Sequence, residues 1–161
     1  RAQPKILYAA EPFLLVLEEM ALAAYVNYAE TCLDPERLPY APDWAHCLQF
    51  DPTGDLIIVT ARKRDKLIGY ALGLIGPFKH SKDKIYADLD TIWVRPDNRS
   101  GFIGLKLIKK WEEEVLKRKK ISFILVNSSH KHPIGALLKR RGYQPVETIY
   151  YKNVEHEYGS E

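Results

Sequence analysis

The chain of 161 residues is 46% hydrophobic and 28% charged, which is typical of a globular domain and excludes disordered, collagen-like and low-complexity chains. Its net charge of +3 is too small to indicate a nucleic-acid partner. Two cysteines make no disulfide framework or metal site, and no apolar run reaches the ~18–20 residues of a membrane span. We find no secretory leader, and we expect one domain over residues 1–161 in a reducing cytoplasm.

The chain predicts two helices followed by strands and helices that alternate. Apolar residues recur at helical spacing in some segments and at every second position in others. In chain order we expect helices over residues 12–32 and 43–50, strands over 55–62, 67–75 and 85–94, a helix over 102–119, a strand over 121–126, a helix over 133–141 and a strand over 143–154. The strand–helix–strand unit over residues 85–126 predicts a parallel crossover. Its helix then begins at the carboxyl end of a strand, where open α/β sheets bind ligands.

Two of these strands show distinct polarity patterns. Strict alternation over residues 85–94 would place Asp88 and Asp90 on one face with Ile92 and Val94. Carboxylates are depleted inside strands, so each of these two needs a reason to be there. A catalytic role is one reason, and a structural ion pair or loop cap is the other. The strand over residues 121–126 is almost continuously apolar, which predicts burial on both faces.

The segment over residues 94–104 carries the clearest chemistry. A proline turn and two glycines lead into an amphipathic helix. The first helical amides have no intrahelical acceptor, and the helix dipole adds positive charge, so the segment predicts an anion site suited to a pyrophosphate. Arg95 and Arg99 would add formal charge. The alternative is an ordinary turn with a solvated loop. No Walker motif and no Rossmann fingerprint is present, which argues against those nucleotide sites.

This pattern resembles the acetyl-CoA motif of the GNAT superfamily of N-acetyltransferases, in which a strand and a proline turn precede R-x-x-G-x-G/A at a helix start. The corresponding residues are Ile92, Trp93, Val94, Pro96, Arg99, Ser100, Gly101, Phe102, Ile103 and Gly104. The Gly142–Tyr143 pair after the last helix also fits the family. The likeness covers residues 55–154, with residues 1–50 as substrate-side helices. It looks closest to a group often encoded in phage genomes, which shares His80 and Asp90.

The resemblance implies an α/β (α+β) fold with a mixed, mostly antiparallel sheet, a splayed parallel β-α-β unit and helices on both faces. It implies transfer of an acetyl group from acetyl-CoA to a primary amine of a small molecule or protein by direct attack. Backbone amides near residues 92–94 would face the thioester, and residues 99–104 would hold the pyrophosphate. Because an ammonium group must lose a proton before it attacks, Asp90, His80 and Asp88 are the candidate catalytic residues. No metal is implied, and a homodimer is left open.

Two departures from the family pattern keep other functions open. Phe102 stands where the motif has its first glycine, and Leu138 stands where many members carry a tyrosine that protonates the leaving thiolate. A CoA thiol should have a pKa near the ~8.5 of cysteine, so we expect the thiolate to leave without that acid. One alternative is a non-catalytic protein of this fold that binds a partner or host protein. Another is acetylation of a modified nucleobase, although the weak charge argues against nucleic acid.

Overall fold

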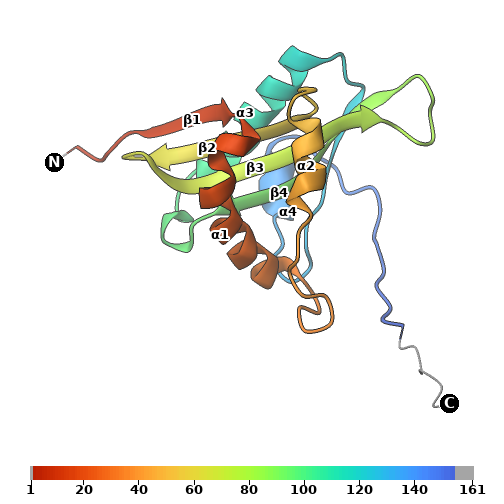
Figure 1. The fold of residues 1–161 in the computed structure, drawn as a ribbon, viewed down its shortest axis with the longest axis horizontal. Helices are drawn as coiled ribbons and strands as arrows, with labels where there is room; N and C mark the ends of the chain where they lie inside the picture. The colour runs from red at the N-terminus through yellow and green to blue at the C-terminus, as the bar shows by residue number, and fades with distance from the viewer. Residues whose placement is uncertain (1, 155–161) are drawn as a thin grey trace.

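The computed structural model describes residues 2–154, which form a five-stranded sheet with helices on both faces (Figure 1). The elements are β1 (Ile6–Glu11), α1 (Phe13–Thr31), α2 (Trp44–Phe50), β2 (Leu56–Lys63), β3 (Lys66–Pro77), β4 (Ile85–Val94), a 3-10 turn at Pro96–Asn98, α3 (Ile103–Arg118), β5 (Phe123–Val126) and α4 (Gly135–Arg140). The strand order is β1-β2-β3-β4-β5. Pairing is antiparallel up to β4 and parallel between β4 and β5, which confirms the predicted fold class.

Two apolar layers hold the helices against the sheet. On one face, α3 places the fully buried side chains of Trp111 and Val115 against the strands. The Trp111 indole N–H donates to the carbonyl oxygen of Ile57 at 3.2 Å, so its polar atom is satisfied inside the core. On the other face, α1 contributes Phe13 and Met20, which are also fully buried. Helices on both faces are therefore confirmed.

Aspartate side chains support the starts of α1 and α2. Asp43 accepts a hydrogen bond from the His46 amide at 3.0 Å and so caps α2. Asp51, which follows α2, accepts from the Phe13 amide at 3.2 Å and so caps α1 from a distant part of the chain. None of the helices in residues 2–154 is long and apolar enough to cross a membrane.

At the centre of the β3–β4 pair, β4 contains one residue more than β3. Leu72 of β3 pairs with Thr91, whereas the next residue, Gly73, pairs with Leu89. Asp90 therefore has no partner in β3 and forms a β-bulge. A bulge bends the strand and increases its twist locally.

The bulge changes which side chains share a face of the sheet. Leu89 before it and Ile92 and Val94 after it all pack in the apolar layer beneath α3. The prediction that Asp88 and Asp90 share a face with Ile92 and Val94 is wrong, because one extra residue shifts the two-residue period of the strand.

The first strand was not predicted. Ile6, Tyr8 and Ala10 of β1 pack toward the layer beneath α3, whereas Leu7 is 55% exposed. The segment is short and ends in Ala-Ala-Glu, which are poor strand formers. Pairing along β2 supplies the stability that its own sequence does not signal.

Two predictions near the C-terminus are wrong. Residues 143–154 form no strand, and Val146, Ile149 and Tyr150 are exposed. Consequently β5 stands at the edge of the sheet in the described part of the chain and is half-buried along its length, not buried on both faces.

We expect Gly73→Ala to destabilise the fold. A methyl group on Gly73 would lie 2.3 Å from the Asp88 carbonyl oxygen and 2.4 Å from Cζ2 of Trp111, beside the bulge. Such overpacking should lower the free energy of unfolding by ~1–3 kcal/mol or more. Urea unfolding measures this, with Gly76→Ala as the control, because a methyl group there would meet no atom within 4 Å. Equal midpoints for the two variants would contradict the expectation.

Candidate functional site

The strands β4 and β5 separate halfway along β4. Their pairing joins Tyr86–Leu89 to Phe123–Val126, whereas β4 continues to Val94. Beyond Leu89, this edge of β4 has no strand beside it within residues 2–154. Its backbone N–H and C=O groups are therefore available to a ligand, apart from the Val94 carbonyl oxygen, which accepts a hydrogen bond from Arg99.

A cavity of about 200 Å³ lies at this edge, between β4, the β4–α3 loop, α4 and the end of α1. Its lining residues are Asn27, Glu30, Ile92, Trp93, Val94, Asn98, Arg99, Gly101, Gly104, His132, Ile134 and Leu137. Of the residues predicted to bind the donor, Ile92, Trp93, Val94, Arg99, Gly101 and Gly104 line the cavity, and Ser100, Phe102 and Ile103 do not. The structure thus brings the strand end and both glycines to one place.

The start of α3 has no capping side chain among the described residues. Its first intrahelical hydrogen bond runs from the Lys106 amide to the Phe102 carbonyl oxygen at 2.9 Å. The amides of residues 103–105 therefore have no intrahelical acceptor, and the helix dipole adds partial positive charge beside them. Because Gly101 and Gly104 line the cavity next to these amides, the helix start is suited to an anion.

The departure at Phe102 leaves the cavity open. Its side chain is 65% exposed and does not line the cavity. Gly104 faces Leu137 of α4, and a methyl group on Gly104 would lie only 3.1 Å from Leu137 Cδ2. A side chain at this position would therefore press against Leu137, where both residues line the cavity. Leu138, at the position of the family tyrosine, is instead buried in the layer beneath α3.

Arg99 holds the β4–α3 loop in place instead of offering a free charge. Its Nε donates to the Val94 carbonyl oxygen at 2.7 Å, and its Nη2 pairs with Glu30 of α1 at 2.7 Å. Arg95 pairs with Asp97 at 3.2 Å and lines a different hollow. The expected formal charge from these two arginines at the anion site is thus corrected, and the backbone amides carry the attraction there.

Several lining residues were not singled out in the sequence. Asn27 and Glu30 come from α1, and His132 and Leu137 come from the segment around α4. Their places along the chain lie about a hundred residues apart, and no local spacing connects them. Only the position of α1 across the end of the sheet brings them together.

The loop after β5 is fastened to the end of α1. Lys131 Nζ donates to the carbonyl oxygens of Ala29 at 2.8 Å and Cys32 at 3.0 Å. Ser129 Oγ donates to the Thr31 carbonyl oxygen at 2.8 Å. A cation at the C-terminal end of a helix is favourable to its dipole. These contacts hold the segment that leads to His132, which lines the cavity.

Asp88 and Asp90 lie outside the cavity. Asp90 is exposed and accepts a hydrogen bond from Thr91 Oγ1 at 2.8 Å. Thr91 pairs with Leu72, which packs in the layer beneath α1 and α2, so this hydrogen bond places Asp90 on the face that those helices cover. Burial raises the pKa of Cys47 on α2, and the charges of Asp43 and Asp90 add to the rise. Asp88 is half-buried, and burial, followed by the charge of Asp90, raises its pKa. The two carboxylates therefore act on each other.

Aromatic rings gather on the same face. The ring of Tyr40 lies 5.9 Å from that of Tyr25 and 5.1 Å from that of Tyr28. Tyr70 is buried in the sheet beneath them, and burial, with the charges of Tyr40 and Asp90, raises its pKa. Aromatic faces next to carboxylates suit a cationic amine.

His80 lies away from the cavity. Its ring packs against Phe78 at 5.4 Å, and Phe78 contacts Tyr86 and Phe123 at the beginnings of β4 and β5. Ile92 is six residues beyond Tyr86, which corresponds to roughly 20 Å along a strand. The structure therefore does not bring His80 to the residues that line the cavity.

Both the sequence and the fold of this chain match those of known proteins. The model of the acetyltransferase (GNAT) family matches residues 14–143. An aminoglycoside N-acetyltransferase in complex with CoA superposes with a TM-score of 0.69 at 15% identity, over 96% of this chain and 98% of that one. A ribosomal-protein-alanine N-acetyltransferase from Brucella melitensis gives 0.66 at 18% identity, over 94% and 100%.

A predicted acetyltransferase with acetyl-CoA from Clostridium acetobutylicum gives a TM-score of 0.66 at 14% identity, over 92% of this chain and 96% of that one. At these identities the solved structures show the shared fold alone. No curated protein matches the chain. The family model spans most of the chain, including both strands of the separated pair and the start of α3. The chain therefore belongs to the acetyltransferase (GNAT) family, whose members take their acetyl group from acetyl-CoA.

Proposed function

We propose that this protein transfers the acetyl group of acetyl-CoA directly to a primary amine of a small molecule or protein. The observation that carries the proposal is the uncapped start of α3, which opens with Gly101 and Gly104 on the cavity beside the unpaired edge of β4. The amides of residues 103–105 would hold the pyrophosphate, and the backbone of residues 92–94 would face the pantetheine arm and the thioester carbonyl. Acetyl-CoA supplies an acyl group activated as a thioester.

The amine would approach from the face that α1 and α2 cover. We call the 200 Å³ cavity at the edge of β4 the donor cavity. Trp93 connects it with this face, since Trp93 packs in the layer beneath α1 and also lines the cavity. Asp90 lies on the α2 side of the sheet, two residues before Ile92 in the chain, and is exposed. It can therefore take a proton from an incoming ammonium group, directly or through water. Asp88, with its raised pKa, is the second candidate. The place of His80 argues against a role in this step.

The acceptor is proposed as a cationic amine, because the carboxylates and the tyrosine rings of this face attract positive charge. The likeness to a phage-encoded group and a homodimer stay predictions. A non-catalytic protein of the same fold would differ in a measurable way, since it would release no CoA thiol with any amine.

Donor binding is tested by thermal unfolding with acetyl-CoA. At a ligand concentration 100 times its Kd, we expect about 2.7 kcal/mol of added stability. Gly104→Asp should abolish this increase in melting temperature, because the aspartate side chain fills the space beside Leu137 and its charge repels a pyrophosphate. Gly76→Asp, in open space on β3, is the control and should keep the shift. A melting temperature that millimolar acetyl-CoA leaves unchanged, or a full shift in Gly104→Asp, contradicts the assignment.

The proposed base is tested by Asp90→Asn, assayed by CoA thiol release with the best acceptor from an amine screen. We expect kcat/KM to fall by ~10²–10³, with acetyl-CoA binding retained. The loss should shrink at high pH, where the amine arrives neutral. Asp83→Asn, in the exposed loop before β4, is the matched control. Full activity of Asp90→Asn would remove it as the base and direct the same assay to Asp88→Asn.

The raised pKa of Asp88 predicts a pH-dependent stability. The folded state binds the Asp88 proton more tightly than the unfolded chain does, where the ordinary pKa is 3.8. Stability is therefore lost as pH rises from that value through the raised pKa. Asp88→Asn removes the loss, so it should raise the free energy of unfolding more at about pH 7 than at about pH 4. Urea unfolding at both pH values checks this, and a pH-independent difference from wild type would refute it.

A further inference from the structure

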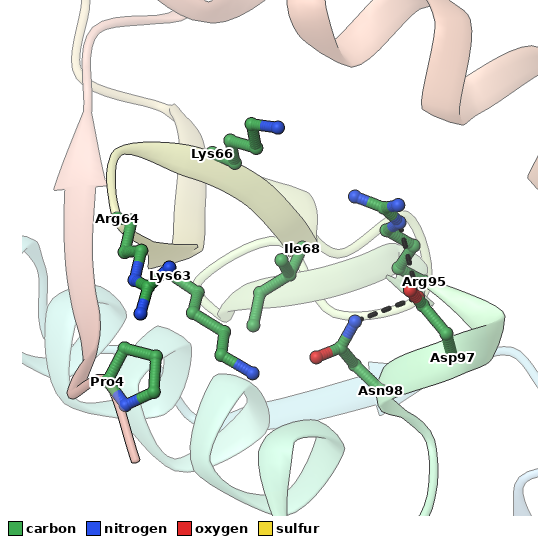
Figure 2. Close-up of a pocket in the computed structure, with 8 residues that line it drawn as sticks. All are labelled: Pro4, Lys63, Arg64, Lys66, Ile68, Arg95, Asp97 and Asn98. Atoms are coloured by element: carbon green, nitrogen blue, oxygen red, sulfur yellow. Dashed lines mark hydrogen bonds and ion pairs between the residues drawn. The ribbon is translucent and has the colours of Figure 1, made fainter. Parts of the chain in front are cut away.

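A second and larger hollow, of about 480 Å³, lies on the other side of the β4–α3 loop (Figure 2). It is formed by the β2–β3 turn, the segment before β1 and the loop that follows β4. Asn98 lines both this hollow and the donor cavity, so one loop separates the two. The volume is within the ~300–1,000 Å³ range of small-molecule sites.

Positive charge gathers around this hollow. Its lining residues include the cations Lys63, Arg64, Lys66 and Arg95 and one carboxylate, Asp97. Asp97 pairs with Arg95 at 3.2 Å, and no ion pair or side-chain hydrogen bond within residues 2–154 compensates the other three cations. In Figure 2 the Lys63 amine points into the space between Ile68 and Asn98, Arg64 points toward Pro4, and Lys66 points away.

The neighbouring Arg62 shows that this lack of partners is local. Its guanidinium pairs with Glu11 at 2.9 Å and with Glu19 at 2.9 Å, so its charge is satisfied within the fold. A third hydrogen bond, from Arg62 Nη1 to the Asp65 carbonyl oxygen at 2.9 Å, holds the turn. Arg64 and Asp65 both have positive φ, of 49° and 65°. The unpaired cations are therefore carried by a tight, anchored turn.

We propose that this hollow is a second anion site, which binds a phosphate monoester or diphosphate group. Ammonium and guanidinium groups make short, charge-assisted hydrogen bonds to phosphate oxygens, and several cations around one concave surface attract such a ligand over a distance. On the same wall the Asn98 amide donates one hydrogen bond to Asp97 Oδ1 at 2.8 Å and has a second N–H to offer. The inference does not depend on the acetyl transfer, because none of these cations lines the donor cavity.

The phosphate can come from two sources. The first source is the bound donor itself. Because the hollow shares the Asn98 wall with the donor cavity, the 3′-phosphate of CoA, which dephospho-CoA lacks, can extend around the loop into the hollow. A separate phosphate-bearing molecule can also occupy it while the donor is bound. The chemistry is the same in both cases, and CoA and dephospho-CoA distinguish them.

The test titrates inorganic pyrophosphate, at constant ionic strength, into protein saturated with dephospho-CoA, which occupies the donor cavity without a terminal phosphate. The variant is Lys63→Glu/Arg64→Glu, and the matched control is Lys79→Glu/Lys82→Glu in the β3–β4 loop. We expect wild type and control to bind pyrophosphate equally, and the variant to bind at least about tenfold more weakly. If the charge reversal unfolds the protein, Lys63→Gln/Arg64→Gln replaces it, with a smaller loss in the same direction.

The second arm compares CoA with dephospho-CoA. If the donor supplies the phosphate, CoA binds wild type about tenfold more tightly than dephospho-CoA, and the variant loses that difference. If a separate molecule supplies it, the two bind alike and pyrophosphate still binds protein saturated with CoA. Equal pyrophosphate affinity in wild type and variant overturns the proposal. The proposal is also overturned if pyrophosphate does not bind and the variant still prefers CoA to dephospho-CoA. Should dephospho-CoA itself not bind, the donor assignment fails, and titration of the free protein still tests the hollow.

Discussion

The extra residue in the middle of β4 is the feature on which the candidate site depends. Asp90 has no partner in β3, and the pairing of β4 with β5 ends at Leu89, the residue before it. A bulge bends its strand and increases the twist, so the part of β4 that follows leaves the direction of β5. That separation exposes the edge of β4 to the donor cavity. The same bulge places a carboxylate on the opposite side, toward α2, where an amine would lose its proton.

The core beneath α3 supports this arrangement. Gly73 lets the backbone of β3 lie against β4 at the bulge, and the fully buried Trp111 covers that point. Because Trp111 and Val115 anchor α3 to the sheet, they also set where its first turn lies. The amides that would hold a pyrophosphate therefore owe their position to apolar packing two or three helical turns away. The same helix therefore contributes to the stability of the core and to the proposed donor site.

Charge is distributed far more unevenly than the net value of +3 suggests. Glu30 of α1 satisfies Arg99, and Glu11 and Glu19 satisfy Arg62, so both arginines serve to hold segments together. Among residues 2–154, the cations of the adjacent β2–β3 turn have no such partners. One side of the β4–α3 loop thus presents backbone amides and the other presents cationic side chains. Both arrangements are local, so the net charge of the whole chain does not indicate either of them.

By itself the sequence determined the elements whose signals are local. The bounds of β4, the two strands before it and the glycine-containing start of α3 could all be predicted, because burial of successive residues leaves a period in the chain. Tertiary structure alone decided the bulge at Asp90, the pairing of β1, the absence of a strand over residues 143–154 and the partnership of Arg99 with Glu30. Each of these depends on a contact between distant segments, and neither the register of a strand nor the partner of a charge is recorded in the residues beside it.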